Sequence, residues 1–425
     1  MRTTGTKSEA LIRGLLLACL ALAVLAPPLA AQAQAQNQPL IIAHVAPTTG
    51  RFALHAEADR RGVEMAIEEY NARGGVLGRE LVLISRDPSL EPEQAAKVAG
   101  ELIEHTDAAF LIGAISSGVA ASMSAVCQEK GMIFINTNSS APSESLENAH
   151  RSKFVFDAHG ANINRALLKY ALAKQDSKRV LLLSEDDLFG RSNAEAMKPY
   201  IAEYGGQVVG EVLAPEDMPD PKALLRQVAQ IPADVVAVSI SGDNQIKLFS
   251  QIDPAVLERQ AWIVGEVDWE ELYPAPGTPR PLFGTTWAWH LDTPGTVAFV
   301  DRYRQRYGHT RLAYPGDVTH AAYLATKALL EAITRAGSTD NHAVIAQLEA
   351  YRASAAERMQ HAPAWMDPVS HHLQQSVYIA RWNPRSTRPE LGLEILGHVP
   401  PEEARLEQEA QTRLEPLAET PRLAR

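Results

Sequence analysis

The hydrophobic residues of this chain follow two alternating patterns from Leu40 onward. Short continuous apolar runs, of which Leu40–Ala46 (LIIAHVA) is the first, are typical of strands covered on both faces. Between these runs lie segments with the i, i+3, i+4, i+7 spacing of an amphipathic helix. The first such segment is Arg61–Asn71, and Gly74-Gly75 ends it. This alternation predicts an α/β fold with parallel sheets.

The alternation runs through two consecutive units. The predicted strands of the first unit are Leu40–Ala46, Glu80–Ser85, Ala108–Gly113 and Met132–Asn136, and its predicted helices are Arg61–Asn71, Pro92–His105 and Ser117–Glu129. After Phe154–Asp157 the alternation restarts. The predicted strands of the second unit are Val180–Ser184, Val208–Leu213, Val235–Ile240 and Trp262–Gly265, with helices Asn162–Ala173, Gly190–Tyr204, Pro221–Ile231 and Asn244–Ile252. We therefore predict two doubly wound parallel-sheet lobes.

The pattern changes in the last third of the chain. Four prolines crowd residues 274–281, which predicts a loop. Predicted helices follow at Val297–Tyr307, Val318–Ala336 and His342–Ala350, and Gln375–Trp382 is predicted as the last strand. Residues 399–425 are charged and low in apolar content, so we predict a loose C-terminal tail.

Residues 1–35 have the organisation of a secretory signal peptide. Arg2, Lys7 and Arg13 give a positive start, and Leu15–Leu25 is apolar but too short to span a bilayer. Small-x-small motifs at residues 31–33 and 33–35 offer two cleavage sites. We expect export and removal of this segment. A lipobox-like stretch that ends at Cys19 leaves lipidation open.

The chain without this segment is acidic and has one cysteine. The 425 residues carry a formal net charge of −11, and the first 33 residues contribute +2, so the remainder carries −13. A body of this charge repels nucleic acid and anionic membranes, so we expect neither nucleic-acid binding nor membrane insertion. Outside the signal segment only Cys127 remains, which excludes an internal disulfide and a zinc–cysteine site.

The sequence has no recognisable catalytic motif. We find no His-Glu-x-x-His, phosphate-loop, Gly-x-Gly-x-x-Gly or Gly-x-Ser-x-Gly pattern. The adjacent His371 and His372 lack partners for a metal site, so we assign them a surface or hinge role. We expect no enzymatic activity, no catalytic residue, no cofactor and no metal.

Four segments rich in polar residues follow predicted strands. Ligands of open parallel sheets bind beyond the carboxyl ends of the strands, so these segments are candidates for a binding site. They are Pro47–His55, Ser116–Gly118, Asn136–Pro142 and Gly265–Trp269. Hydroxyls at a helix N-terminus suit a carboxylate, and the acids of the last segment suit an ammonium group.

Each segment also has a plainer explanation. Ser116 and Ser117 could be ordinary helix N-caps, and Asn136–Ser140 could be an ordinary turn. Glu266 and Asp268 could be solvated loop acids. The binding hypothesis therefore depends on all four segments falling at strand ends.

The same segments carry a family resemblance. In order along the chain the pieces are Ala46–Gly50 (APTTG), Arg61–Ala66 (RGVEMA), Asn71–Gly78 (NARGGVLG), Leu111–Gly113 with Ser116-Ser117, and Asp187–Arg191 (DLFGR). From Leu40 to Pro384 the chain resembles the type I periplasmic binding proteins, in particular the Leu/Ile/Val-binding branch that serves ABC importers. The piece Asn71–Gly78, after an amphipathic helix, is the most specific.

The resemblance implies a set of ligand-binding residues. It assigns a ligand carboxylate to Ser116, Ser117, Asn138 and Ser140, with Ser139 in the same segment, and an ammonium group to Glu266. It places His55 over the ligand in one lobe and Phe189 in the other. Ser241 lies close to the position of a tyrosine in the branched-chain proteins, which puts aliphatic specificity in doubt.

The resemblance also implies how the lobes are divided. Lobe one would comprise residues 40–158 and 286–370, and lobe two residues 159–285 and 371–398, so that the chain crosses between them three times. Closure about these crossings would trap the ligand.

Two functions follow from the resemblance. The first is a periplasmic, monomeric substrate-binding protein that delivers an amino acid, or a related amine, amide or acid, to an ABC permease and ATPase. The second is a periplasmic ligand sensor that partners a signalling receptor.

Overall fold

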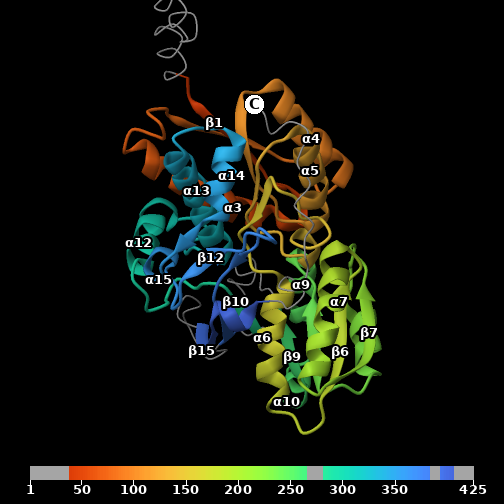
Figure 1. Cartoon of the computed structure of the whole chain (residues 1–425). Helices are drawn as coiled ribbons and strands as arrows, with labels where there is room; N and C mark the ends of the chain where they lie inside the picture. Colours follow the sequence, from red (N-terminus) through yellow and green to blue (C-terminus); the bar gives the residue numbers. More distant parts are fainter. Residues whose placement is uncertain (1–37, 266–280, 383–392, 406–425) are drawn as a thin grey trace, which may run out of the picture.

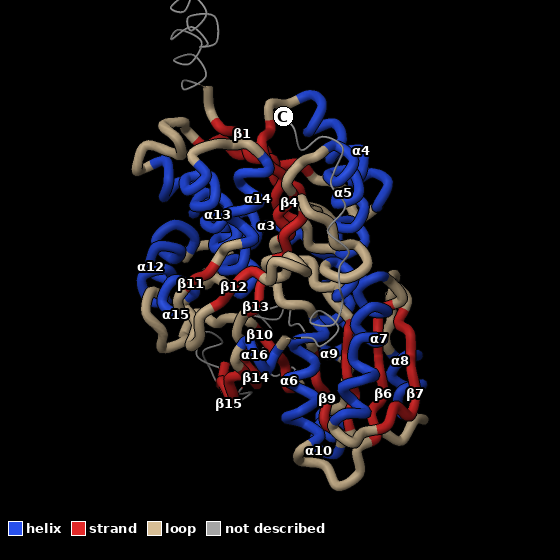
Figure 2. The backbone as a smooth tube through the Cα atoms, viewed as in Figure 1, coloured by secondary structure: helices blue, strands red, loops and turns tan. Residues whose placement is uncertain are grey.

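The protein consists of two α/β lobes that meet along one face. The computed structural model describes residues 38–265, 281–382 and 393–405. Figure 1 shows the lobe with β1, α3, α4, α5, α13 and α14 above the lobe with β6, β7, β9 and α6. In both lobes helices cover the two faces of a central sheet (Figure 2). The predicted α/β class with two parallel-sheet lobes is confirmed.

The sheet of lobe one is entirely parallel, with strand order β2-β1-β3-β4-β5. Its strands are β1 (Leu40–Val45), β2 (Leu81–Arg86), β3 (Ala108–Gly113), β4 (Phe134–Asn136) and β5 (Lys153–Val155). The apolar side chains of α4 (Pro92–His105) and α5 (Ser117–Lys130) cover one face. The other face packs against α3 (Ala53–Asn71), α13 (Asp317–Ala336) and α14 (Asn341–Glu349), so a late part of the chain completes this lobe.

The sheet of lobe two has strand order β15-β14-β10-β9-β8-β6-β7. The parallel strands are β6 (Arg179–Glu185), β7 (Gln207–Ala214), β8 (Val235–Ser239), β9 (Ala261–Val264) and β10 (Leu282–Thr285). Strand β14 (Val377–Trp382) pairs antiparallel with β10, and β15 (Leu393–Val399) pairs antiparallel with β14. One face packs on α6 (Gly160–Leu172) and α7 (Leu188–Glu203). The other packs on α8 (Lys222–Ala229), α9 (Gly242–Ser250) and α12 (Thr296–Tyr307). The short helix α10 (Pro254–Arg259) precedes β9.

Buried polar side chains tie together the segments where the chain passes between the sheets. The Gln375 amide donates to the backbone oxygen of Phe156 at 2.9 Å, and the Gln360 amide donates to that of Thr286 at 2.7 Å. Nearby lie α15 (Ala355–Arg358) and a small antiparallel sheet of β11 (Arg352–Ala353), β12 (Ala364–Met366) and β13 (Leu373–Gln374). His372 is buried there, and its ring stacks on His159 with centroids 3.9 Å apart, so it does not lie on the surface.

Three details differ from the sequence-based predictions. Helix α3 begins at Ala53 rather than Arg61, because Ala56, Ala58 and Asp59 already face the core. Strand β15 follows β14, so Gln375–Trp382 is not the last strand. The first residues of the predicted tail are ordered: α16 (Pro401–Ala404) packs on α6, where the Asn162 amide donates to Ala404 O at 3.0 Å.

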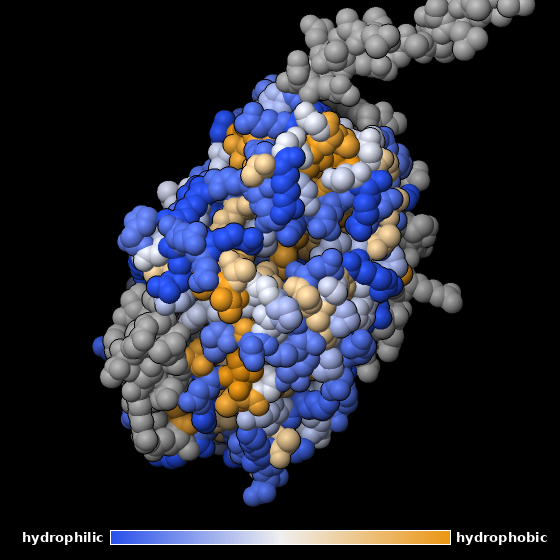
Figure 3. All heavy atoms as spheres, turned by 90° about the vertical axis from the view of Figure 1, so that its left-hand side faces the viewer, coloured by the Kyte–Doolittle hydropathy of each residue, from blue (hydrophilic) through white to orange (hydrophobic). Residues whose placement is uncertain are grey.

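The surface of the described part is mainly hydrophilic. Figure 3 shows polar side chains over most of one face, with hydrophobic ones gathered in limited patches. Among the helices of the described ranges, none combines the length and the hydropathy needed to cross a bilayer.

Candidate functional site

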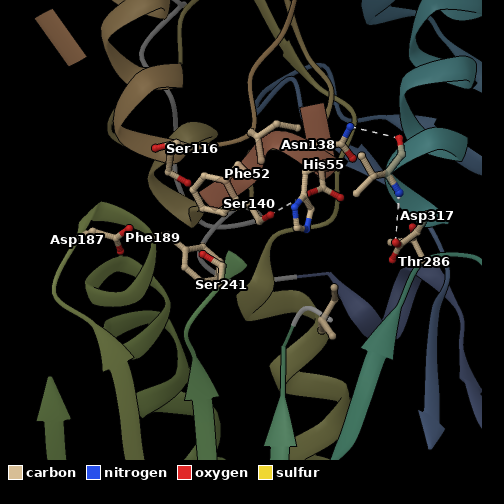
Figure 4. Close-up of a pocket in the computed structure, with 15 residues that line it drawn as sticks. Phe52, His55, Ser116, Asn138, Ser140, Asp187, Phe189, Ser241, Thr286 and Asp317 are labelled. Carbon is tan, nitrogen blue, oxygen red and sulfur yellow. Dashed lines mark hydrogen bonds between the residues drawn. The ribbon is translucent and has the colours of Figure 1, made fainter. Parts of the chain in front are cut away.

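A small cavity of about 40 Å³ lies between the lobes, where the carboxyl ends of both sheets meet (Figure 4). Residues of both lobes line it: Phe52, His55, Ile115, Ser116, Ser117, Asn138, Ser140, Asp157, Ile163, Asp187, Phe189, Ser241, Thr286, Asp317 and Val318. Most of them follow directly after a strand. The lining residues follow the carboxyl ends of seven strands from both sheets, namely β1, β3, β4, β5, β6, β8 and β10, so these seven ends meet at the cavity.

The N-terminus of α5 forms one wall of the cavity. Ser116 is the N-cap residue and Ser117 is the first helical residue, yet the Ser116 side chain makes no capping hydrogen bond. The first-turn N–H groups and two hydroxyls therefore lie at the positive end of the α5 dipole. Such an end favours an anionic group.

The amide of Asn138 is fixed from behind by buried polar groups. It donates to the Asp59 carboxylate and to Val318 O, the latter at 3.3 Å. The other Asp59 oxygen contacts His44 Nε2 at 2.8 Å, and His44 Nδ1 contacts Ser85 Oγ at 2.9 Å. This chain of contacts presents one face of Asn138 to the cavity.

Ser139 and Ser140 have different surroundings. Ser139 does not line the cavity, and its hydroxyl donates to Ser117 Oγ at 3.2 Å. Ser140 lines the cavity, and its hydroxyl donates to Asp157 Oδ2 at 2.8 Å. Ser139 thus orients a lining residue.

His55 projects toward the centre of the cavity from the first turn of α3 (Figure 4). His55 is 4 % exposed, and its ring packs edge-on against Phe52, with centroids 5.8 Å apart. Because α3 begins at Ala53, His55 belongs to a regular helix and not to a turn, and the helix backbone fixes the position of its side chain.

Lobe two supplies the opposite wall. Asp187 caps α7 by accepting a hydrogen bond from Gly190 N at 2.8 Å, and Phe189 follows in the first turn. Ser241 is the N-cap residue of α9. Of the nine predicted residues, seven line the cavity, Ser139 lies behind it, and Glu266 lies outside the described residues.

The sequence reasoning missed several lining residues, above all Asp157 and Asp317. Asp157 comes two residues after β5, so the strand-end rule could have found it. Asp317 opens α13, and its carboxylate accepts a hydrogen bond from Thr285 Oγ1 at 2.6 Å. No local signal marks Asp317, because its place depends on how α13 returns to lobe one.

An ion pair links the lobes beside the cavity. Arg51, in the loop after β1, donates to the Glu185 carboxylate at the end of β6. Asn244 Nδ2 also donates to this carboxylate at 2.6 Å, and Ser241 Oγ donates at 3.3 Å. Burial raises the pKa of Glu185 to about 7 despite the nearby guanidinium.

The arrangement is suited to binding. Two walls from separate lobes enclose short hydroxyl and amide side chains, carboxylates, the His55 imidazole and two phenylalanine rings. In the described part of the chain, no three His, Cys, Asp or Glu side chains lie close enough together to hold a metal ion. A polar cleft closed between two α/β lobes defines the class of solute-binding proteins.

Comparison of this chain with known proteins identifies its family. The family model described as "Periplasmic binding protein" matches residues 39–388, and the chain belongs to this family, in its type I, Leu/Ile/Val-binding branch. This confirms the resemblance.

Individual relatives agree. The chain is 28% identical over 323 residues to Leu/Ile/Val-binding protein homolog 7 of Brucella abortus, covering 72% of this chain and 79% of the relative. A periplasmic binding protein from Burkholderia mallei has a similar structure, with a TM-score of 0.78, 20% identity, and coverage of 90% of this chain and 99% of that one. A solute-binding protein of R. palustris in complex with benzoate gives a TM-score of 0.74 at 20% identity, with coverage of 85% and 97%. These relatives are binding proteins and not enzymes, as predicted.

Proposed function

We propose that this protein is exported to the periplasm, where it captures a small polar ligand between its lobes and delivers it to an ABC permease and ATPase. The observation that carries the proposal is the cavity itself, which is lined by polar residues from both lobes. The lobe boundaries predicted from the sequence, with a hinge at three crossings, form part of the proposal. Opening and closing about this hinge would admit and retain the ligand.

We assign the ligand carboxylate to the N-terminus of α5. The hydroxyls of Ser116 and Ser117 and the first-turn N–H groups are the donors there. The named relatives support a carboxylate, because one is called a Leu/Ile/Val-binding protein and another holds benzoate, and amino acids and benzoate share this group. His55 and Phe189 would contact the rest of the ligand, and Glu266 remains our candidate for an ammonium group.

A thermal-shift screen of the mature protein, starting at about Gln36, tests the proposal. The compounds are amino acids, amides, urea and aromatic acids. A ligand that binds only the folded state adds roughly 4 kcal/mol of stability at a thousandfold excess over Kd. We expect a clear rise in Tm with at least one compound, reduced in Ser117→Ala. No rise with any compound would contradict the proposed function.

A further inference from the structure

A buried arginine lies near the segments where the chain passes between the sheets. Arg358 is the last residue of α15 and is 1 % exposed, and its Nη2 donates to Gln375 Oε1 at 2.6 Å. Within the described ranges, its buried Nε and Nη1 atoms have no hydrogen-bond acceptor. An arginine is almost never fully buried unless a negative charge pairs with it. The folded chain would therefore gain stability from an anion at this position.

The neighbouring titratable groups do not balance the charge of Arg358. Burial lowers the pKa of Arg358, although Tyr351 acts in the opposite direction. Burial also raises the pKa of Tyr351, so its hydroxyl is neutral at pH 7 and supplies no negative charge. Glu331 and Glu357 raise the pKa of Tyr351 further, but neither carboxylate accepts a hydrogen bond from the guanidinium in the described structure. Glu357 instead accepts from the N–H and the hydroxyl of Ser354, both at 2.7 Å.

Trp287 adds another unused donor to this region. It is 0 % exposed, and its Nε1–H has no acceptor in the described part of the chain. Its ring stacks on that of His320, with the planes 1° apart and the centroids 4.7 Å apart. His320 Nε2 in turn contacts Arg358 O at 2.9 Å. The indole and the guanidinium thus belong to one buried region, in which three nitrogen atoms have unused N–H groups.

The unused acceptors of this region are neutral. Burial lowers the pKa of His320 well below its ordinary value of 6.5, so its ring is uncharged. Its Nε2 faces a carbonyl oxygen and therefore carries the proton, so Nδ1 is an acceptor, and it has no donor among the described residues. Gln360 Oε1 is a second such acceptor. Water could satisfy these two atoms, but it does not cancel the charge of Arg358, whereas an anion does.

Hydrogen bonds connect this region to all three segments where the chain passes between the sheets. Gln375, which accepts from Arg358, donates to Phe156 O at 2.9 Å. Gln360 donates to Thr286 O at 2.7 Å. Thr286 lines the ligand cavity, whereas Arg358 does not. An anion bound to Arg358 would therefore lie outside the cavity, next to the segments that join the two lobes.

We propose that Arg358 and Trp287 form a buried binding site for one small monovalent anion, such as chloride. The anion would accept from Nε and Nη1 of Arg358 and from Nε1 of Trp287, and it would cancel the guanidinium charge. Neither residue lines the ligand cavity, so this site is separate from the ligand site and does not depend on the proposed function.

Anomalous diffraction with bromide locates the anion. The protein is unfolded in urea and refolded in sodium bromide, so that a buried anion has exchanged before crystals are grown in the same salt. We expect an anomalous peak within hydrogen-bonding distance of Arg358 Nη1 and Trp287 Nε1. A map with only water at this position would overturn the proposal.

The melting temperature in solution measures the same binding. Protein refolded without halide is compared in sodium chloride and in sodium gluconate at equal ionic strength, because gluconate is too large for a buried site. An anion that binds only the folded state raises Tm by mass action. We expect Tm to be at least about 2 °C higher in chloride than in gluconate.

Two variants and a control assign the effect to this site. Arg358→Gln removes the charge, so the chloride-dependent rise in Tm should disappear. Trp287→Phe keeps a ring that stacks on His320 but removes the indole N–H, so the rise should fall by half or more. Arg191→Gln is the matched control, because Arg191 lies on α7 with its side chain 57 % exposed and pairs with Asp186. This variant should retain the full rise.

The outcomes of the Tm measurements decide the proposal. Equal Tm values in chloride and gluconate would overturn it, and so would a full chloride-dependent rise in Arg358→Gln. If Arg358→Gln does not fold, the decision falls to Trp287→Phe, in which an undiminished rise would contradict the assigned donors.

Discussion

Glu185→Gln should change how the stability of this protein depends on pH. The Glu185 side chain is 0 % exposed, and burial raises its pKa from an ordinary value of 4.5 to about 7. The folded protein therefore retains a proton that the unfolded chain releases above pH 4.5. Stability from this group is complete below about pH 4.5 and declines as the pH rises through about 7.

The size of the effect follows from the shift. One pKa unit corresponds to about 1.4 kcal/mol, so the ionisation of Glu185 costs the folded state about 3 kcal/mol above pH 7. Glutamine has the same shape and does not ionise, and Asn244 can still donate to its oxygen. We expect the difference in free energy of unfolding, variant minus wild type, to grow by about 3 kcal/mol between pH 4.5 and pH 8.

Urea unfolding followed by tryptophan fluorescence at a series of pH values measures this difference. The substitution also changes the contact with Arg51. This contribution to the free energy of unfolding does not depend on pH, so it cancels when the difference at pH 8 is compared with the difference at pH 4.5. Glu195→Gln is the matched control, because Glu195 lies on α7 with its side chain 71% exposed. A difference that stays constant within about 0.5 kcal/mol would refute the reasoning.

Other predictions concern single residues. Gly190→Ala should destabilise the protein by about 1–3 kcal/mol, because its Cβ would lie 2.1 Å from the backbone oxygen at the end of β6. Gly100→Ala, in the middle of α4 with open space around it, should stabilise by about 0.5–1 kcal/mol; urea unfolding that ranks the two variants in the reverse order would be inconsistent with this packing. Cys127 is buried, which raises the pKa of its thiol, so Ellman's reagent should react only after unfolding; rapid reaction of the native protein would show that the core of lobe one opens. Asp59→Ala should cost about 1–3 kcal/mol for each buried donor that it leaves unpaired and should weaken ligand binding through Asn138; unchanged affinity in calorimetry would argue against this positioning role.

Much of the fold was predictable because its signals are local. Continuous apolar runs marked β1, β3, β6 and β8, and the i, i+3, i+4, i+7 spacing of apolar residues marked the later part of α3. Strand β15 escaped because Leu393–Val399 contains Glu394 and His398 and pairs only at the edge with β14. Its existence depends on a partner strand and not on its own composition.

The site was predictable to the extent that strand ends define it. The rule located Ser116, Ser117, Asn138 and Ser140 because polar residues cluster after their strands. It did not locate Asp317, which enters from a helix that begins 177 residues or more further along the chain than these four. Long-range packing places this carboxylate, and no short motif encodes such packing.

The packing of α3 against α13 sets an order of events during synthesis. Gly62 on α3 lies so near to α13 that an added Cβ would be 2.3 Å from Thr319 O, and Arg61 donates to Leu312 O across 251 positions of sequence. Until α13 has been made, the side of α3 that packs on α13 has no partner, while all five strands of its sheet already exist. An incomplete chain that ends before α13 therefore exposes this face. Contacts of such long range slow folding and leave the growing chain open to aggregation, so a holding chaperone should bind it there.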